Sequence, residues 1–344
     1  MAELTLEQVW ANARQIMAPN CRVCPVCDGR ACRGEIPGVG AMGDGSSWTA
    51  CVEFLKRCKL NLDTVYDYHG IDPSFSLFGR DFALPIMIGP IGGMGYNYNT
   101  ALTNEQYSMT IARGARQAGI LPFTGGDSVG GGLFRQGLDV TRAVDGVNVI
   151  TMKPFENELL LPRLPLLQEA GAIAFSSDID AAGFANMGDA VGKVLPKSVE
   201  QLRELTSATP IPFILKGVMT PKGAVKAAQA GCAAIIVSTH GGRVITSAPS
   251  TCSVLPAIRA AVGDSLKIIV DGGLRSGVDV FKALALGADA AMIGRPYAVA
   301  AHGGGEEGVA LYTEKLGAEL RHTMQMCGAA TLADITPDMV TVEP

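Results

Sequence analysis

Short apolar segments alternate with amphipathic segments along most of this chain. From residue 84 onward, eight apolar runs of four to six residues are too short for helices and predict buried strands. Between them, apolar residues recur at helical spacing, and several of these segments follow a Ser, Thr or Asn suited to capping. The expected strands are Leu84–Ile88, Ile120–Phe123, Asn148–Met152, Ala172–Ser176, Ile211–Lys216, Ala234–Ser238, Lys267–Asp271 and Ala290–Ile293.

Eight strands with intervening helices predict an α/β fold of the (β/α)8 TIM-barrel type. The region from residue 84 to residue 327 is close to the ~250 residues of such a barrel. A doubly wound sheet is the alternative, and it needs a long crossover that the pattern does not contain. Expected helices include Asn104–Ala118, Phe155–Glu169, Val199–Thr206, Pro221–Ala230, Thr251–Ala261 and Val278–Leu286.

The first 82 residues read as an extension that packs on a barrel formed by residues 83–344. Thr5 and Gln8 have the spacing of a capping box at the start of a helix. A glycine-rich loop is expected over residues 34–45 and a second helix over residues 46–60. Short extended pieces between residues 61 and 82 are expected to cover the bottom of the barrel.

Composition narrows the class of protein. The chain has 344 residues, 48% of them hydrophobic, and a formal net charge of −5. This charge, without any block of Lys and Arg, argues against nucleic-acid binding. No apolar run approaches the ~18 residues of a membrane span, and the N-terminus lacks the basic and apolar regions of a signal peptide. A soluble, cytoplasmic protein is expected.

Four of the nine cysteines fall within twelve residues, as Cys21, Cys24, Cys27 and Cys32. Cysteines of a cytosolic chain more often bind metal or stay reduced than form disulfides. Spacings of two residues allow one loop to wrap an iron–sulfur cluster, although the run differs from the bacterial ferredoxin pattern and from a zinc ribbon. The hypotheses are an iron–sulfur cluster, a zinc site, which is less favoured, or a loop of reduced thiols.

Polar residues suited to catalysis follow the predicted strands. His240 and Arg243 follow the strand 234–238, and the ends of parallel strands carry the chemistry of α/β enzymes. The other reading of His240 is a solvated residue that ends a core strand. After the seventh and eighth strands, Asp271-Gly272-Gly273-Leu274-Arg275 and Gly294-Arg295 combine small residues with arginines. This combination predicts a phosphate site, because small residues let backbone N–H groups approach an anion.

These segments, together with Ile214-Leu215-Lys216-Gly217-Val218, resemble the FMN-dependent α-hydroxy-acid dehydrogenase/oxidase family, which includes glycolate oxidase and lactate oxidase. The resemblance is close from about residue 212 to the C-terminus and looser from residue 84 to residue 178. It implies an FMN cofactor, a small α-hydroxy or α-keto acid as partner, and a homo-oligomer, a tetramer in the family.

The resemblance also implies roles for individual residues. Lys216 would stabilise reduced flavin, and His240 would take the substrate hydroxyl proton as hydride moves to the flavin. Arg243 would bind the substrate carboxylate, and Asp178 would pair with and orient His240. The implied flavin contacts are Pro90, Ile91, Gly92, Thr124, Ser176, Lys216 and Ser238 around the ring, and Asp271, Gly272, Gly273, Arg275, Gly294 and Arg295 around the phosphate and ribityl chain.

Three family features are missing or replaced. The N-terminal loop has no tyrosine before its Gly-Ala element, Thr151-Met152-Lys153 stands where the family has Gln-x-Tyr, and the segment after Asp178 carries no arginine. Lys153 is a candidate second cation for the substrate, or a solvated lysine. The predicted function is oxidation of a lactate- or glycolate-like acid. The alternatives are another FMN-dependent reductase, a flavin-assisted isomerase, and a flavin-binding protein without turnover.

Overall fold

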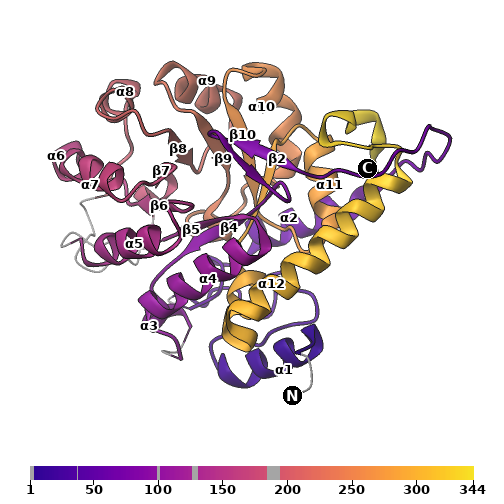
Figure 1. The fold of residues 1–344 in the computed structure, drawn as a ribbon, viewed down its shortest axis with the longest axis horizontal. Coiled ribbons are helices and arrows are strands. Elements are labelled where there is room, and N and C mark those ends of the chain that lie inside the picture. Colours follow the sequence, from indigo (N-terminus) through magenta and orange to yellow (C-terminus); the bar gives the residue numbers. More distant parts are fainter. Residues whose placement is uncertain (1–3, 37, 99–100, 126–130, 184–193) are drawn as a thin grey trace.

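The computed structural model describes residues 4–36, 38–98, 101–125, 131–183 and 194–344. Eight parallel strands close into a barrel at the centre of the molecule, and helices surround it (Figure 1). The predicted TIM barrel is therefore confirmed. The barrel strands are β4 (Ile86–Ile91), β5 (Leu121–Thr124), β6 (Val149–Met152), β7 (Ala174–Asp178), β8 (Phe213–Lys216), β9 (Ala234–Val237), β10 (Lys267–Asp271) and β11 (Ala290–Ile293).

Most of the outer helices begin where the sequence indicates. Thr5, Thr103, Ser198 and Ser276 each form a capping box with the residue three positions on. One expected helix, residues 155–169, is broken in three, because Pro162 and Pro165 each lack a backbone N–H donor. The helices are α1 (Leu6–Ile16), α2 (Ser46–Arg57), α3 (Met94–Asn97), α4 (Asn104–Ala118), α5 (Gly132–Ala143), α6 (Asn157–Leu160), α7 (Leu164–Glu169), α8 (Val199–Ser207), α9 (Pro221–Gln229), α10 (Leu255–Val262), α11 (Gly277–Ala285) and α12 (Arg295–Met326), with 3₁₀ turns η1 (Leu161–Arg163), η2 (Ile179–Gly183), η4 (His240–Gly242), η5 (Cys252–Val254), η6 (Leu332–Asp334) and η7 (Pro337–Met339).

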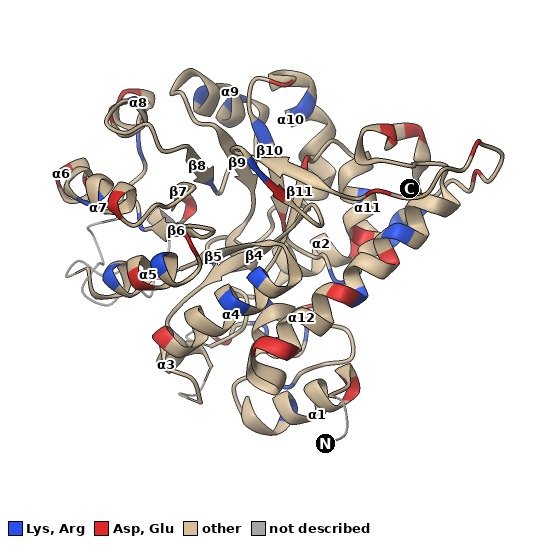
Figure 2. Cartoon of the chain, viewed as in Figure 1, with Lys and Arg blue, Asp and Glu red and all other residues tan. Residues whose placement is uncertain are grey.

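Apolar side chains fill the barrel, and the N-terminal part of the chain closes one end of it. Strands β2 (Phe75–Leu77) and β3 (Arg80–Phe82) form an antiparallel pair. Phe75 and Phe82 belong to the same buried cluster as the barrel residues Met87 and Ile214. The expected cover for the barrel bottom is thus present. Charged side chains lie mainly on the outer helices (Figure 2).

Segments from the N-terminal and C-terminal parts of the chain pair on the outside of the barrel. Strand β1 (Cys58–Leu60) pairs antiparallel with β12 (Val340–Val342). Helix α1 packs against the long helix α12, where the side chain of Asn12 donates to the carbonyl of Gly303 at 3.1 Å. A Cβ atom on Gly303 would lie 1.9 Å from the carbonyl oxygen of Val9, so the glycine allows this close approach. Residues 6–16 and 58–60 of the N-terminal part therefore pack against the C-terminal part of the chain.

Candidate active site

Three predicted catalytic residues lie together at the carboxyl ends of neighbouring strands. Asp178 ends β7 and is paired in register with Lys216, which ends β8. His240 follows β9, the next strand around the barrel. Both Asp178 and Lys216 are buried, at 3% exposure each. The barrel therefore brings side chains from three strand ends, spread over more than sixty residues of sequence, into one polar cluster.

Asp180 hydrogen-bonds to His240, and the prediction that Asp178 orients the histidine requires correction. Asp180 Oδ1 lies 3.0 Å from His240 Nδ1, whereas Asp178 Oδ2 lies 3.9 Å from the same atom. Asp178 instead accepts from Lys153 Nζ at 2.5 Å. The chain leaves β7 in the 3₁₀ turn η2, which directs the later carboxylate toward the histidine. The sequence contains one indication of this role, because Asp180 is a second carboxylate two residues after Asp178 at the same strand end.

Gly217 makes room for this arrangement. Its φ is +99°, in the left-handed region that favours glycine. A Cβ atom at residue 217 would lie 2.6 Å from both Cβ and Cγ of Asp180, closer than real contacts allow. Gly217 thus lets Asp180 sit between Lys216 and His240.

The charges of the cluster fix its protonation. Burial opposes ionisation of Asp180, but Lys216 and His240 outweigh it and lower the pKa of Asp180 to about 2. Burial and the charge of Lys216 lower the pKa of His240, while Asp180 acts against them. Ionised Asp180 can only accept, so His240 Nδ1 carries the donated proton and Nε2 is the basic nitrogen.

Lys216 is a buried ammonium beside carboxylates. Burial acts against its charge, but Asp180, Asp271 and Asp178 raise its pKa. Its Nζ lies 3.6 Å from Asp180 Oδ2. Among the residues that the structure describes, Nζ has no hydrogen-bond acceptor, and neither Asp180 Oδ2 nor Asp178 Oδ1 has a donor. Buried polar atoms are nearly always hydrogen-bonded, so this group of atoms has capacity for a polar ligand.

Arg243 is held by the N-terminal part of the chain. Its guanidinium donates to the carbonyl of Gly38 at 2.5 Å and to Asn97 Oδ1 at 3.0 Å. The same Asn97 oxygen accepts from the backbone N–H of Gly38 at 3.2 Å. Burial, followed by the charge of Arg295, lowers the pKa of Arg243 to about 10. The contact between Asn97 and Arg243 could not be predicted from the sequence, because the two residues are 146 positions apart.

The other predicted ring contacts are polar groups bound to neighbouring strands. Ser238 donates to Asp271 Oδ2 at 2.8 Å and accepts from the backbone N–H of His240 at 3.0 Å. Ser176 shares a hydrogen bond with Thr151, and Thr124 accepts from Asn148. Residues 90–92, which contain Pro90, Ile91 and Gly92, are partly exposed at and just after the end of β4.

The glycines of the predicted phosphate segment pack against helix α2. A Cβ atom on Gly273 would lie 2.8 Å from the backbone of Cys51, and one on Gly272 would lie 3.0 Å from Thr251 Oγ1. Close packing therefore favours glycine at both positions, in addition to the predicted role in ligand binding. Gly294 differs, because a Cβ atom there would meet only Ile91 at an ordinary distance of 3.6 Å.

Both arginines predicted to bind phosphate contact carbonyl groups of the N-terminal segment. Arg275 donates to the carbonyl of Cys27 from Nε at 3.1 Å and from Nη2 at 2.8 Å. Arg295 donates to the carbonyls of Val39 and Gly40 at 2.8 and 3.1 Å. Its guanidinium carbon lies 3.6 Å from the ring centroid of Trp48. Their phosphate role stays a prediction.

The four N-terminal cysteines line a single cavity of about 620 Å³ together with Arg275 and Arg295. All nine cysteines of the chain lie in its described part and are free thiols. Within that part, no three cysteine sulfurs come within 4.8 Å of one another. Four thiolates at ~2.3 Å from one zinc ion would be about 3.8 Å apart, so the segment does not form a ready zinc site.

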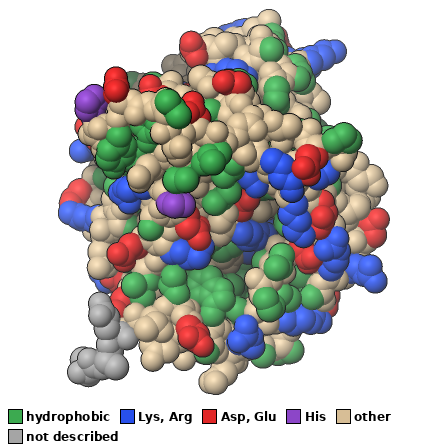
Figure 3. Space-filling view, turned by 90° about the vertical axis from the view of Figure 1, so that its right-hand side faces the viewer, with side chains coloured by type: hydrophobic (Ala, Val, Ile, Leu, Met, Phe, Trp, Pro, Cys, Tyr) green, Lys and Arg blue, Asp and Glu red, His purple; other side chains and the backbone are tan. Residues whose placement is uncertain are grey.

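Helix length and the distribution of charge on one face bear on possible membrane and nucleic-acid partners. None of the helices in the described ranges has the length and apolar character needed to cross a membrane. On the face shown in Figure 3, Lys and Arg side chains are interspersed with Asp, Glu and apolar side chains. This face therefore carries mixed charge and no continuous basic patch.

A closed barrel with a histidine, a lysine and carboxylates at the carboxyl ends of its strands defines the class as an α/β-barrel enzyme scaffold. The FMN-dependent dehydrogenase family matches residues 39–128 and 153–342. The chain belongs to this family. Residues 21–32, with the four cysteines, lie outside the matched region.

Individual relatives agree with this assignment, and a solved structure shares the fold. The chain is 31% identical over 303 residues to L-lactate oxidase from Lacticaseibacillus rhamnosus, covering 77% of each protein. It is 43% identical over 148 residues to L-lactate oxidase from Roseobacter sp., which is 43% of this chain and only 40% of that protein. A solved structure of mandelate oxidase with benzoyl-formic acid superposes with a TM-score of 0.80 at 24% identity over 99% of both chains, and it shows the shared fold.

Proposed function

We propose that this protein oxidises a small α-hydroxy acid, of the lactate or glycolate type, to the α-keto acid with FMN as cofactor. The observation that carries the proposal is the buried cluster in which Asp180 hydrogen-bonds to His240 at 3.0 Å beside Lys216. A neutral imidazole oriented by a carboxylate is a general base, and a buried ammonium stabilises negative charge. The names of the relatives, L-lactate oxidase among them, support this reaction class.

The residues at the strand ends fit FMN. Lys216 Nζ is a buried donor without a hydrogen-bond acceptor among the described residues, and a flavin offers such acceptors. Ser176, Ser238, Thr124 and residues 90–92 would hold the ring. Asp271, Gly272, Gly273, Arg275, Gly294 and Arg295 would hold the phosphate and ribityl chain. FMN, when bound, accepts the hydride from the substrate carbon.

Side chains of the protein transfer the proton and bind the substrate. His240 Nε2 takes the proton of the substrate hydroxyl, while Asp180 keeps the proton of Nδ1 in place and stabilises the imidazolium that forms. Arg243 binds the substrate carboxylate with guanidinium N–H groups. Lys153, whose side chain is only 12% exposed and is paired with Asp178, adds a second cation near the same carboxylate. Its burial argues against the reading of Lys153 as a solvated lysine.

An anaerobic absorption titration tests this function. Protein purified with FMN is mixed with lactate or glycolate, and bleaching of the flavin band is the expected result. His240→Ala protein that retains FMN should bleach at least about 10²-fold more slowly, because the general base is absent. A flavin band that does not respond to α-hydroxy acids would turn the assignment toward a different FMN-dependent reaction. Equal bleaching in the variant would refute the role of His240.

We also propose that Cys21, Cys24, Cys27 and Cys32 bind an iron–sulfur cluster, with zinc as the less favoured alternative. The four thiols line one cavity of about 620 Å³, much larger than a single ion requires. In a four-iron cluster each cysteine binds a different iron, so the sulfurs stand farther apart than around one zinc ion. A reducing cytoplasmic location would keep these thiols available as ligands.

Such a cluster would make the protein a dehydrogenase instead of an oxygen-consuming oxidase. Oxidation of the substrate releases two electrons and two protons, and the cluster would pass the electrons singly to a one-electron carrier protein. Iron and acid-labile sulfide, measured in anaerobically prepared protein, test the cluster, and zinc in their place would support the alternative. A homo-oligomer, a tetramer by family resemblance, is tested by light scattering.

A further inference from the structure

We infer that the cysteine segment is coupled to the flavin phosphate site through Arg275 and Arg295, so that cluster binding and FMN binding strengthen each other. The inference rests on the proposed function, since it needs both ligands. It concerns a region that the family match does not include, because that match begins at residue 39. The four cysteines therefore lie outside the matched region, whereas both arginines lie inside it.

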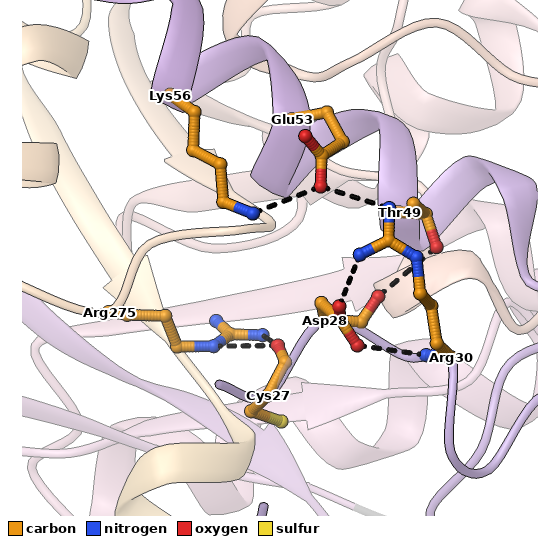
Figure 4. A network of polar contacts seen from close by, with 7 residues as sticks. All are labelled: Cys27, Asp28, Arg30, Thr49, Glu53, Lys56 and Arg275. Carbon is orange, nitrogen blue, oxygen red and sulfur yellow. Dashed lines mark hydrogen bonds and ion pairs between the residues drawn. The ribbon is translucent and has the colours of Figure 1, made fainter. Parts of the chain in front are cut away.

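The cysteine segment is fixed to the body of the protein on both sides of Cys27. On one side, Arg275 from the segment after β10 donates twice to the Cys27 carbonyl (Figure 4). On the other side, Thr49 of α2 donates to the carbonyl of Asp28 at 3.1 Å. Asp28 is also paired with Arg30, which reaches Glu53 on the same helix at 3.1 Å. The backbone at Cys27 thus connects α2 to the predicted phosphate segment.

Arg295 makes the second connection. It is the first residue of α12 and donates to the carbonyls of residues 39, 40 and 241, the last belonging to the turn that carries His240. A Cβ atom on Gly241 would lie 2.1 Å from Arg295 Nη1, so this turn is shaped around the guanidinium. Arg295 stacks on Trp48, which belongs to a small group of buried apolar side chains. Cys27 and Cys32 pack against this apolar group. One side chain therefore contacts the catalytic turn and the surroundings of the cysteines.

Binding of one cluster by Cys21, Cys24, Cys27 and Cys32 would fix the segment that carries the Cys27 carbonyl.

The direction of the coupling follows from the hydrogen bonds. A guanidinium has five N–H donors, and the contacts to loop carbonyls occupy only part of this set in Arg275 and Arg295. A fixed loop would hold the guanidinium planes of Arg275 and Arg295 in one orientation. Their remaining N–H donors would then lose less conformational entropy when they bind a phosphate. Loss of the cluster should therefore weaken FMN binding, within the roughly 5–150-fold range of coupled sites. By reciprocity, FMN should slow loss of the cluster.

The test compares FMN dissociation constants, from quenching of flavin fluorescence, for protein with its cluster and protein stripped by a chelator under anaerobic conditions. Cys27→Ala removes a ligand but keeps the carbonyl that Arg275 contacts, so it should behave like stripped protein. Cys232→Ala, at a buried thiol outside the segment, is the matched control and should behave like wild type. Arg275→Lys should bring the stripped and loaded constants closer together.

The outcomes separate the coupling from the function. Equal FMN affinity in stripped and loaded protein, with iron and sulfide counted in the loaded form, would overturn the coupling and leave the cluster intact. Absence of iron and sulfide after anaerobic reconstitution would overturn both cluster and coupling. Neither result bears on flavin bleaching by α-hydroxy acids, which tests the catalytic proposal by itself.

Discussion

Substitution of Gly217 by alanine tests whether the position of Asp180 controls the base. The added Cβ atom would lie 2.6 Å from Cβ and Cγ of Asp180, and ordinary contact begins at 3.4 Å. Asp180 must therefore move by about 3.4 − 2.6 = 0.8 Å, or the strand end must shift. Moved away from the ring, the carboxylate would lose its 3.0 Å hydrogen bond to His240 Nδ1.

Two terms set the loss of folding stability, and a third sets the loss of rate. Residue 217 has a φ of +99°, and an L-side chain in the left-handed region costs roughly 1–2 kcal/mol of folding stability. The steric overlap adds about 1–3 kcal/mol, as overpacking does in cores. A displacement of about 1 Å in a catalytic group costs on the order of 10²-fold in rate. Gly217→Ala should thus be folded but less stable, and slower in flavin reduction by about 10²-fold.

Stopped-flow measurement of flavin reduction, at saturating FMN and substrate without oxygen, gives the rate constant directly. Gly171→Ala is the matched control, since Gly171 also has a positive φ, of +72°, but has no atom within 4 Å of the added Cβ. The control should show the backbone penalty in urea unfolding while its reduction rate stays at the wild-type value. A folded Gly217→Ala protein that reduces flavin as fast as wild type would show that the placement of Asp180 does not matter.

Three further outcomes are expected. The pKa of His240 is lowered, and the base works in its neutral form, so the reduction rate should stay constant through neutral pH and fall only below the ordinary histidine range; a decline that begins above pH 7 would contradict this. Asp180→Asn should slow reduction by about 10²–10⁴-fold and lower the pKa of His240 further, whereas Asp178→Asn should have a smaller effect, as pH profiles of both variants would show. Arg243→Lys should lower kcat/KM about 10–100-fold, mainly through KM, because an ammonium cannot bind a carboxylate with two parallel hydrogen bonds.

Some helices could not be placed correctly from the sequence. Helix α12 was not among the expected elements, since Gly303, Gly304 and Gly305 weaken a helical pattern. The structure explains Gly303 and Gly304, because added Cβ atoms would collide with Val9 of α1. Gly305 has a φ of +59° and interrupts the helix there. The packing of two distant helices decided this element.

The sequence by itself determined the barrel and the place of its site. Strand and helix periodicities and capping boxes involve residues within a few positions of one another, so they can be read without knowing the fold. All eight strands lie within three residues of their expected positions at each end. Because the carboxyl ends of parallel strands meet at one face, His240 and Lys216 could be grouped in advance.

Only the tertiary structure decided which groups meet. In the folded protein Asp180, and not Asp178, hydrogen-bonds to His240. Arg275 donates to the carbonyl of Cys27, which is 248 residues away in sequence. Such partners depend on barrel register and on the paths of the loops, which place atoms to within an ångström. Local propensities set the chain into strands and helices, but hydrogen bonds between distant segments are fixed only when the whole core is packed.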